Sequence, residues 1–173
     1  MAWRIDSEQP QDAEAIEALL DTAFGAARRR LTAYRFRAHV PAIAALSHVL
    51  RAADGRVLGS IRFWPILLTA GSRREQALLL GPVAVAPSIR GNGAGLALIA
   101  HAMEKAARLD LARYVFLIGD LPYYGRAGFR PTLPARAELP GPFDPRRLLY
   151  RPLVADAPAL PERFALCPWS PAD

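Results

Sequence analysis

The feature that most constrains the fold is a strand, a glycine-rich turn, a helix and a second strand in immediate succession. Residues 76–86 are mostly apolar, which predicts a buried strand, and glycines follow at positions 91, 93 and 95. Apolar side chains then recur at spacings of three and four, which predicts a helix, at Leu96, Ile99, Ala100, Met103 and Ala107. The run Tyr114–Ile118 is typical of an interior strand. Two strands joined by a helix run parallel with a right-handed crossover, so we expect an α/β fold.

The N-terminal part of the chain predicts smaller elements around this unit. Residues 3–5 form a short strand, and residues 12–24 have helical apolar spacing that ends at Gly25. A second short helix and a loop are expected within residues 28–45. Two strand-like runs, residues 47–52 and 56–66, flank the turn tripeptide Ala-Asp-Gly and predict a hairpin.

The C-terminal part is rich in proline. Ten of the 16 prolines lie between Pro131 and Pro171, so long regular elements are not expected there. Residues 148–154 predict one strand, which Pro152 limits to an edge or to its own end. The apolar segment 164–169 is expected to dock on the body or on a second subunit, as in a homodimer. We expect one domain over residues 1–173, with residues 131–173 packed on it.

Cysteine usage and the apolar runs bear on the compartment. A single cysteine, Cys167, excludes an internal disulfide and favours a reducing compartment. The longest apolar runs are far shorter than the roughly 20 residues that cross a bilayer, and residues 1–6 lack the apolar core of a signal peptide. We therefore expect a cytoplasmic protein with no membrane partner. The three histidines lack metal-ligand spacing, so no metal is expected.

The net charge of +6 comes mainly from arginine. The densest basic stretch is Arg28-Arg29-Arg30, followed by Arg35 and Arg37. It predicts either a solvated surface or attraction to a polyanion or an acidic substrate. No aromatic stacking pattern or nucleic-acid module accompanies it, so a nucleic-acid partner is not expected.

The glycine-rich turn has the properties of a pyrophosphate site. Its glycines allow close approach to a ligand and positive φ angles, and the following helix adds unpaired amides and the positive end of its dipole. The expected binding residues are Arg90, Gly91, Asn92, Gly93, Ala94 and Gly95. A kinase-like P-loop is absent, and Leu96 interrupts a dinucleotide-binding fingerprint. The spacing that fits is Arg-x-x-Gly-x-Gly.

Residues 80–129 resemble the GCN5-related N-acetyltransferase (GNAT) superfamily, and most closely its YhbS-like branch. Two motifs carry the resemblance. One is the turn over residues 90–95, and the other is Tyr123-Tyr124-Gly125-Arg126-Ala127-Gly128-Phe129, similar to aromatic-Tyr-x-Lys/Arg-x-Gly-Phe. They stand in the expected order, separated by one helix and one strand.

The resemblance implies a mixed sheet with splayed central strands that binds acetyl-CoA. In such proteins a bulged strand pairs with the pantetheine arm, and one of its amides faces the thioester oxygen. Here that strand is Val83, Ala84 and Val85, the amides of residues 90–95 hold the pyrophosphate, and Arg126 is a further cofactor contact.

Acyl transfer needs a proton donor for the departing thiolate and an uncharged amine. Tyr124 matches the general-acid tyrosine of the family, whereas its rival Tyr123 is expected in the core. Asp120 is the candidate general base, although it could equally cap a loop, and Glu75 is a weaker candidate. Leu117 departs from the pattern, because the family often has an asparagine there.

We expect an N-acetyltransferase that transfers the acetyl group of acetyl-CoA to a primary amine of a small molecule or peptide. Transfer would be direct, in a ternary complex, because no nucleophile for a covalent relay is visible. The alternative is a non-catalytic CoA-binding or sensing module, which the missing base favours. A nucleic-acid or protein-binding domain that uses the arginines is a third hypothesis.

Overall fold

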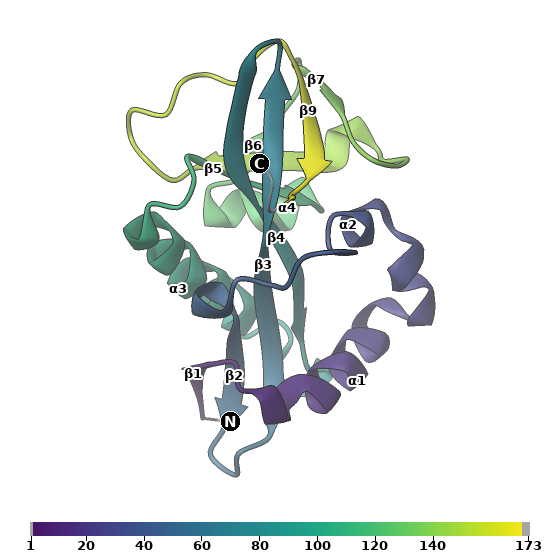
Figure 1. Cartoon of the computed structure of the whole chain (residues 1–173). Helices are drawn as coiled ribbons and strands as arrows, with labels where there is room; N and C mark the ends of the chain where they lie inside the picture. Colours follow the sequence, from purple (N-terminus) through teal and green to yellow (C-terminus); the bar gives the residue numbers. More distant parts are fainter. Residues whose placement is uncertain (1, 171–173) are drawn as a thin grey trace.

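One mixed sheet of nine strands runs through residues 2–170, the part of the chain that the computed structural model describes (Figure 1). In chain order its strands are β1 (Trp3–Ser7), β2 (His48–Ala52), β3 (Val57–Ala70), β4 (Arg73–Val85), β5 (Tyr114–Ile118), β6 (Arg130–Pro131), β7 (Arg136–Glu138), β8 (Leu148–Pro152) and β9 (Arg163–Pro168). The α-helices are α1 (Ala13–Phe24), α2 (Thr32–Arg35), α3 (Ala94–Leu109) and α4 (Leu121–Tyr124). Short 3-10 helices join several of them, including Ala26–Arg30 and Pro87–Ile89.

The spatial order of the main path is β1-β2-β3-β4-β5-β8-β6. The expected hairpin is confirmed as the antiparallel pair β2 and β3, and the expected parallel pair is confirmed as β4 and β5. β3 extends to Ala70, beyond the expected end at Ile66, because it continues as the long hairpin with β4. The fold is therefore the α/β arrangement with a mixed sheet that the sequence predicts.

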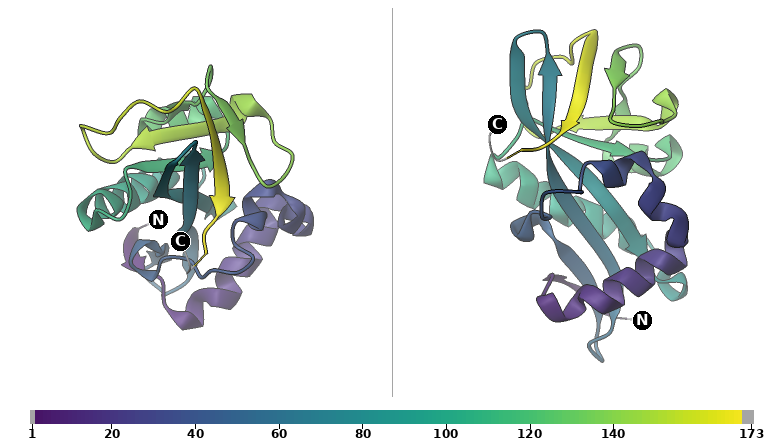
Figure 2. Two further views of the ribbon diagram at one scale, coloured as in Figure 1. Left: turned by 45° about the horizontal axis from the view of Figure 1, so that its top comes forward. Right: turned by 45° about the vertical axis from the view of Figure 1, so that its right-hand side comes forward.

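Helices α1 and α3 cover opposite faces of the sheet (Figures 1 and 2). Buried side chains of α3, among them Leu98, Ile99 and Met103, join the largest apolar cluster, whereas Ile16 and Leu20 of α1 belong to another. Full burial of such a side chain stabilises the fold by about 1.5–3 kcal/mol. No helix within residues 2–170 has the length and apolar character needed to span a bilayer.

Strands β4 and β5 separate soon after they meet. Their parallel register contains only the pairs Leu78 with Val115 and Leu79 with Phe116. Between Leu80 and Val83 the register of β4 with β3 also shifts, which marks a bulge. The expected splay of the central strands is therefore present, and it leaves one edge of the last part of β4 without a strand partner in the described chain.

The apolar tail docks on the body of the same chain as β9. It pairs antiparallel with β3, from Ile66 opposite Pro168 to Thr69 opposite Ala165, and parallel with β7. Pro152 is the last residue of β8, so the proline limits this strand at its end, which is one of the two expected outcomes. β8 is not an edge strand, because it lies between β5 and β6.

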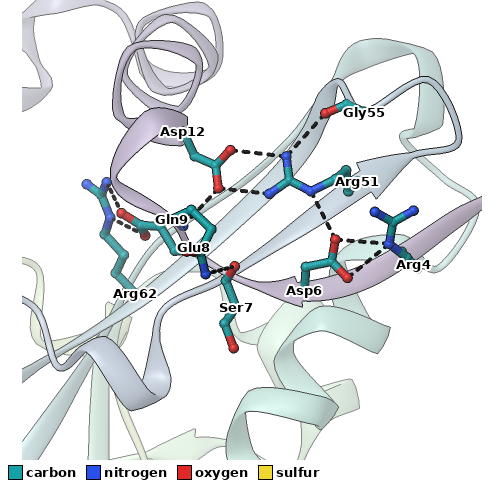
Figure 3. Close-up of polar contacts among 9 residues, drawn as sticks. All are labelled: Arg4, Asp6, Ser7, Glu8, Gln9, Asp12, Arg51, Gly55 and Arg62. Atoms are coloured by element: carbon teal, nitrogen blue, oxygen red, sulfur yellow. Dashed lines mark hydrogen bonds and ion pairs between the residues drawn. The ribbon is translucent and has the colours of Figure 1, made fainter.

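Two groups of charged side chains fasten the start of α1 to the sheet (Figure 3). Arg51 of β2 donates from Nη1 and Nη2 to both carboxylate oxygens of the buried Asp12, at 3.1 and 2.8 Å, and from Nε to Asp6 at 2.9 Å. Arg62 of β3 donates to both oxygens of Glu8, at 2.8 and 2.7 Å. These bonds hold the β1–α1 connection against β2 and β3.

The basic stretch is only partly solvated, which corrects the expectation of an exposed face. Arg29 and Arg30 are exposed, but Arg28 is only 2% exposed. Its guanidinium donates to Glu17 at 2.6 Å and to Asp21 at 2.9 Å. Two carboxylates one helical turn apart on α1 therefore allow Arg28 to be buried.

Candidate active site

The N-terminus of α3 opens onto a cleft through the glycine-rich turn. Gly91 has a φ of 82° and Gly93 a φ of 75°, a region that residues with a Cβ rarely adopt. In the described chain no side chain caps α3, whose first backbone bond at this end runs from the Ala97 amide to the Gly93 carbonyl, at 2.9 Å. The amides before Ala97 can therefore bind an anion, which the positive end of the helix dipole also favours.

A cleft of about 510 Å³ lies between this turn, the end of β4 and the segment after β5. Its lining residues are Ala23, Phe24, Val83, Ala84, Val85, Ile89, Arg90, Gly91, Gly93, Ala94, Gly95, Leu96, Asp120, Tyr123 and Arg126. The cleft thus brings together all the cofactor-binding residues expected from the sequence except Asn92, which is exposed and outside this lining. The Arg90 Nε donates to the Val85 carbonyl at 3.4 Å, which ties the turn to β4.

The edge of β4 that faces the cleft is open. β5 pairs with β4 only as far as Leu79, so residues 80–85 have a strand neighbour, β3, on one side only within the described chain. An extended ligand with amide groups could add to this edge as a strand would. The bulge lies immediately before Val83, where the edge enters the cleft.

Tyr123 lies in the cleft, which corrects the expectation that it belongs to the core. Its side chain is 37% exposed, and its hydroxyl occupies the space that a Cβ on Gly95 would need. α4 is a single turn, and its Tyr123 side chain reaches Gly95 in the first turn of α3. Burial raises the pKa of the Tyr123 hydroxyl, and the charge of Arg126 opposes that shift.

Tyr124 lies deeper than Tyr123, is half-buried and does not itself line the cleft. Its ring packs against the largest apolar cluster and contacts the Phe129 ring edge-on, with centroids 6.2 Å apart. Burial raises the pKa of its hydroxyl to about 12, and the charges of Tyr123 and Asp120 act in the same direction. The phenol therefore keeps its proton at neutral pH and can act as a hydrogen-bond donor.

Asp120 lines the cleft at the N-terminus of α4. Its side chain is 74% exposed, and its carboxylate forms an ion pair with Arg147, at 3.3 Å. Its backbone carbonyl accepts from the amides of Tyr123 and Tyr124, which anchors the short helix. Glu75 pairs with Arg73 on β4 and is not part of the cleft.

Sequence reasoning missed the part of the cleft that α1 supplies. Ala23 and Phe24 end α1, and Phe24 is 49% exposed. An apolar side chain on the last turn of an amphipathic helix is a common core position, so its spacing alone carried no sign of a ligand. Only the path of α1 across β4 brings it there.

The model of the Acetyltransferase (GNAT) family matches residues 13–129. The chain belongs to this family. The match includes α1, the glycine-rich turn and both tyrosines of α4, and it confirms the resemblance that the two motifs indicate.

Solved structures confirm the GNAT fold. The GNAT family N-acetyltransferase YhbS from Escherichia coli, solved in complex with CoA, is 23% identical, with a TM-score of 0.77 over 94% of this chain and 88% of that chain. A GNAT family acetyltransferase from Brucella melitensis, solved in complex with acetyl-CoA, is 28% identical, with a TM-score of 0.67 over 99% of both chains. No curated protein matches the chain.

Proposed function

We propose that this GNAT-family chain transfers the acetyl group of acetyl-CoA directly to a primary amine of a small molecule or peptide. The observation that carries the proposal is the meeting of three features in one cleft: the glycine-rich turn before α3, the open edge of β4 and Tyr123 of α4, whose chain neighbour Tyr124 lies behind it. These three features correspond, in the same order, to three parts of a CoA thioester: the diphosphate, the amide-containing arm and the reacting sulfur.

The residues present fit this co-substrate. The amides at the start of α3, with the positive charge of Arg90, suit a diphosphate. The open edge beside Val83–Val85 suits the two amides of a pantetheine arm. Acetyl-CoA supplies an acyl group activated as a thioester.

The reaction joins the amine nitrogen to the carbonyl carbon and breaks the bond from that carbon to sulfur. The products are an N-acetyl amide and the CoA thiol, and the proton lost by the amine passes to solvent. A β4 amide near the bulge would donate to the carbonyl oxygen as negative charge develops there. Tyr124 would donate its proton to the departing sulfur and recover one from water.

The proton of the incoming ammonium group must leave before attack. Asp120 is the carboxylate in the cleft lining, so it would accept this proton directly or through a water molecule. Arg147, whose Nη2 lies 3.3 Å from Asp120 Oδ1, would orient this carboxylate and occupy one of its oxygens.

That ion pair favours one alternative, a CoA-binding or sensing module without turnover. Residues 77–86 carry no aspartate or glutamate, so β4 contributes no base to the cleft. Calorimetry with acetyl-CoA, together with a CoA thiol-release assay across a panel of primary amines, separates the two functions. We expect binding and amine-dependent thiol release. Binding without release on any amine would support the sensing module.

A further inference from the structure

A second cavity lies beside the bulge of β4, separate from the cleft that holds the glycine-rich turn. It has a volume of about 310 Å³ and is formed by α1, α2 and β3. Its lining residues are Glu17, Leu20, Arg28, Arg29, Tyr34, Arg37, Ala38, Arg62, Trp64 and Pro82. Pro82 is adjacent in the chain to Val83 of the cleft, so the two cavities meet the same short stretch of β4.

Four arginines and one glutamate line this cavity, but three of the arginines already have acidic partners. Arg28 pairs with Glu17 and Asp21, and Arg29 pairs with the same Glu17. Arg62 pairs with Glu8 (Figure 3). The charges of these arginines are therefore largely balanced within the protein.

Arg37 differs, because it forms no ion pair with any carboxylate in the described chain. Its guanidinium carbon lies 4.2 Å from the centroid of the Tyr34 ring and 5.4 Å from that of Trp64. The two rings thus hold the flat guanidinium in place, and the Tyr34 hydroxyl also interacts with it. No carboxylate within residues 2–170 pairs with this guanidinium, and its buried Nε is left without a partner there.

Burial lowers the pKa of Arg37 to about 10; Tyr34 opposes this shift, and the charges of Arg62 and Arg28 add to it. Arg37 is still positively charged at neutral pH. A partly desolvated charge without a counter-ion is costly, and an anion that enters the cavity would remove that cost.

The position of Arg37 connects this charge to the reaction. Its Nη2 is 3.7 Å from the place that a Cβ on Gly81 would occupy, and the Trp64 Nε1 donates to the Gly81 carbonyl at 2.8 Å. Gly81 lies at the bulge, two residues before Val83. An anion bound to Arg37 would therefore sit beside the part of β4 where the proposed acyl transfer takes place.

We propose that Arg37 binds the oxyanion group, carboxylate or phosphate, of the acceptor, so that the acceptor class is a primary amine that carries such a group. This inference rests on the proposed acetyltransferase function for the identity of the ligand. A guanidinium can donate two parallel hydrogen bonds to a carboxylate or to a phosphate. The volume of the cavity, about 310 Å³, suits a small molecule.

Equilibrium binding tests the inference without turnover. In a full-length Trp3→Phe, Trp169→Phe background, fluorescence reports Trp64, which faces Arg37. The probes are ω-amino carboxylic acids of increasing length with their carboxamides, and phosphoethanolamine with ethanolamine. We expect one of the acids, or phosphoethanolamine, to bind at least tenfold more tightly than its neutral counterpart, as measured by the change in Trp64 emission. Arg37→Gln should abolish this preference, whereas Arg30→Gln, which removes an equal charge outside the cavity, should retain it.

A purely structural role of Arg37 predicts a different result. The melting temperature of Arg37→Gln without ligand should equal or exceed that of the parent, because a costly charge is removed; a lower value would indicate a structural role. Arg37→Lys keeps the charge but loses the fork, and we expect it to weaken binding of the preferred oxyanion by severalfold.

Turnover then separates this inference from the proposed function. We expect kcat/KM for the preferred oxyanion-bearing amine to exceed that of its neutral counterpart at least tenfold, and to fall by a similar factor in Arg37→Gln. Equal use of both by parent and variant, with no selective fluorescence change, would overturn the inference and leave acetyl transfer intact. Selective binding that Arg37→Gln removes, without acetylation of any amine, would support the anion site and contradict the proposed function.

Discussion

The ring of Tyr124 occupies the space that a side chain at Gly119 would need. A Cβ on Gly119 would contact Tyr124 Cε2 and would lie 2.8 Å from Cδ2, closer than real Cβ contacts allow. Gly119 follows the last residue of β5 and precedes Asp120, so this close approach joins the end of the strand to the tyrosine of α4. The position of the Tyr124 ring therefore depends on the absence of a side chain five residues earlier in the chain.

Gly119→Ala should destabilise the protein by about 1–3 kcal/mol, because the half-buried ring of Tyr124 has little room to move. It should also lower turnover, since the phenol would be displaced. Chemical unfolding and the thiol-release assay measure the two effects. Gly125→Ala is the matched control, because its Cβ would meet Leu121 at an ordinary 3.6 Å. Equal behaviour of the two variants would refute the packing argument.

Tyr124→Phe should reduce kcat by at least about 100-fold, the lower range for loss of a general acid, and leave acetyl-CoA affinity unchanged. The raised pKa of Tyr124, about 12, keeps the phenol protonated. Its ionisation should therefore cause no loss of activity between pH 7 and pH 10. Tyr123→Phe is the control and should retain most of the turnover. Full activity of Tyr124→Phe would remove this residue from the mechanism.

Gly93→Val should weaken acetyl-CoA binding at least tenfold. The new side chain would stand at the wall of the cleft that Gly93 lines. The φ of 75° at this position is also strained for a β-branched residue, at a cost of roughly 1–2 kcal/mol. Gly55→Val carries a similar strain, at a φ of 89°, in the β2–β3 turn away from the cleft. Calorimetry should therefore show a loss of affinity in the first variant only. A similar loss in both would attribute the effect to general destabilisation.

Asp12→Asn should lower the free energy of unfolding by about 1–3 kcal/mol, because it weakens two charge-assisted hydrogen bonds from Arg51. The exposed pair Asp54–Arg56 gives the control, for which Asp54→Asn should change stability by less than about 1 kcal/mol. Urea unfolding measures both. A larger effect at Asp54 would contradict the assigned role of the buried pair.

The same contact has a pH signature. Hydrogen bonds from Arg51 lower the pKa of Asp12 below 3.8, and burial opposes that shift. The unfolded chain therefore takes up this proton first, so the contribution of Asp12 is present above about pH 4 and is lost as the pH falls through its folded pKa. Below pH 4, the free energy of unfolding should therefore depend less steeply on pH in Asp12→Asn than in the parent.

Local patterns predicted the central unit of the fold because they act over a few residues. Apolar spacing located α3, the turn tripeptide located the β2–β3 hairpin, and glycine spacing located the turn before α3. Contacts between distant segments could not be predicted in this way. Nothing near Cys167 indicates that it pairs with Leu67 of β3, a hundred residues earlier, and nothing in the basic stretch indicates that Arg28 is buried.

The same limit applied to the candidate site. Motif spacing brought the residues of the glycine-rich turn and β4 together, but it could not distinguish the environments of two adjacent tyrosines. Tyr123 points to the cleft because Gly95 leaves room for its hydroxyl, and Tyr124 packs inward against Phe129. Both placements depend on how α4 meets α3, which is a tertiary relationship.

The most direct test of the central claim compares acetyl-CoA with S-acetylpantetheine by calorimetry at low ionic strength. If the amides at the start of α3 bind the diphosphate, acetyl-CoA should bind at least 100-fold more tightly than the analogue, which keeps the thioester arm but lacks the diphosphate and nucleotide. No measurable affinity for acetyl-CoA, or equal affinity for the two compounds, would contradict the account.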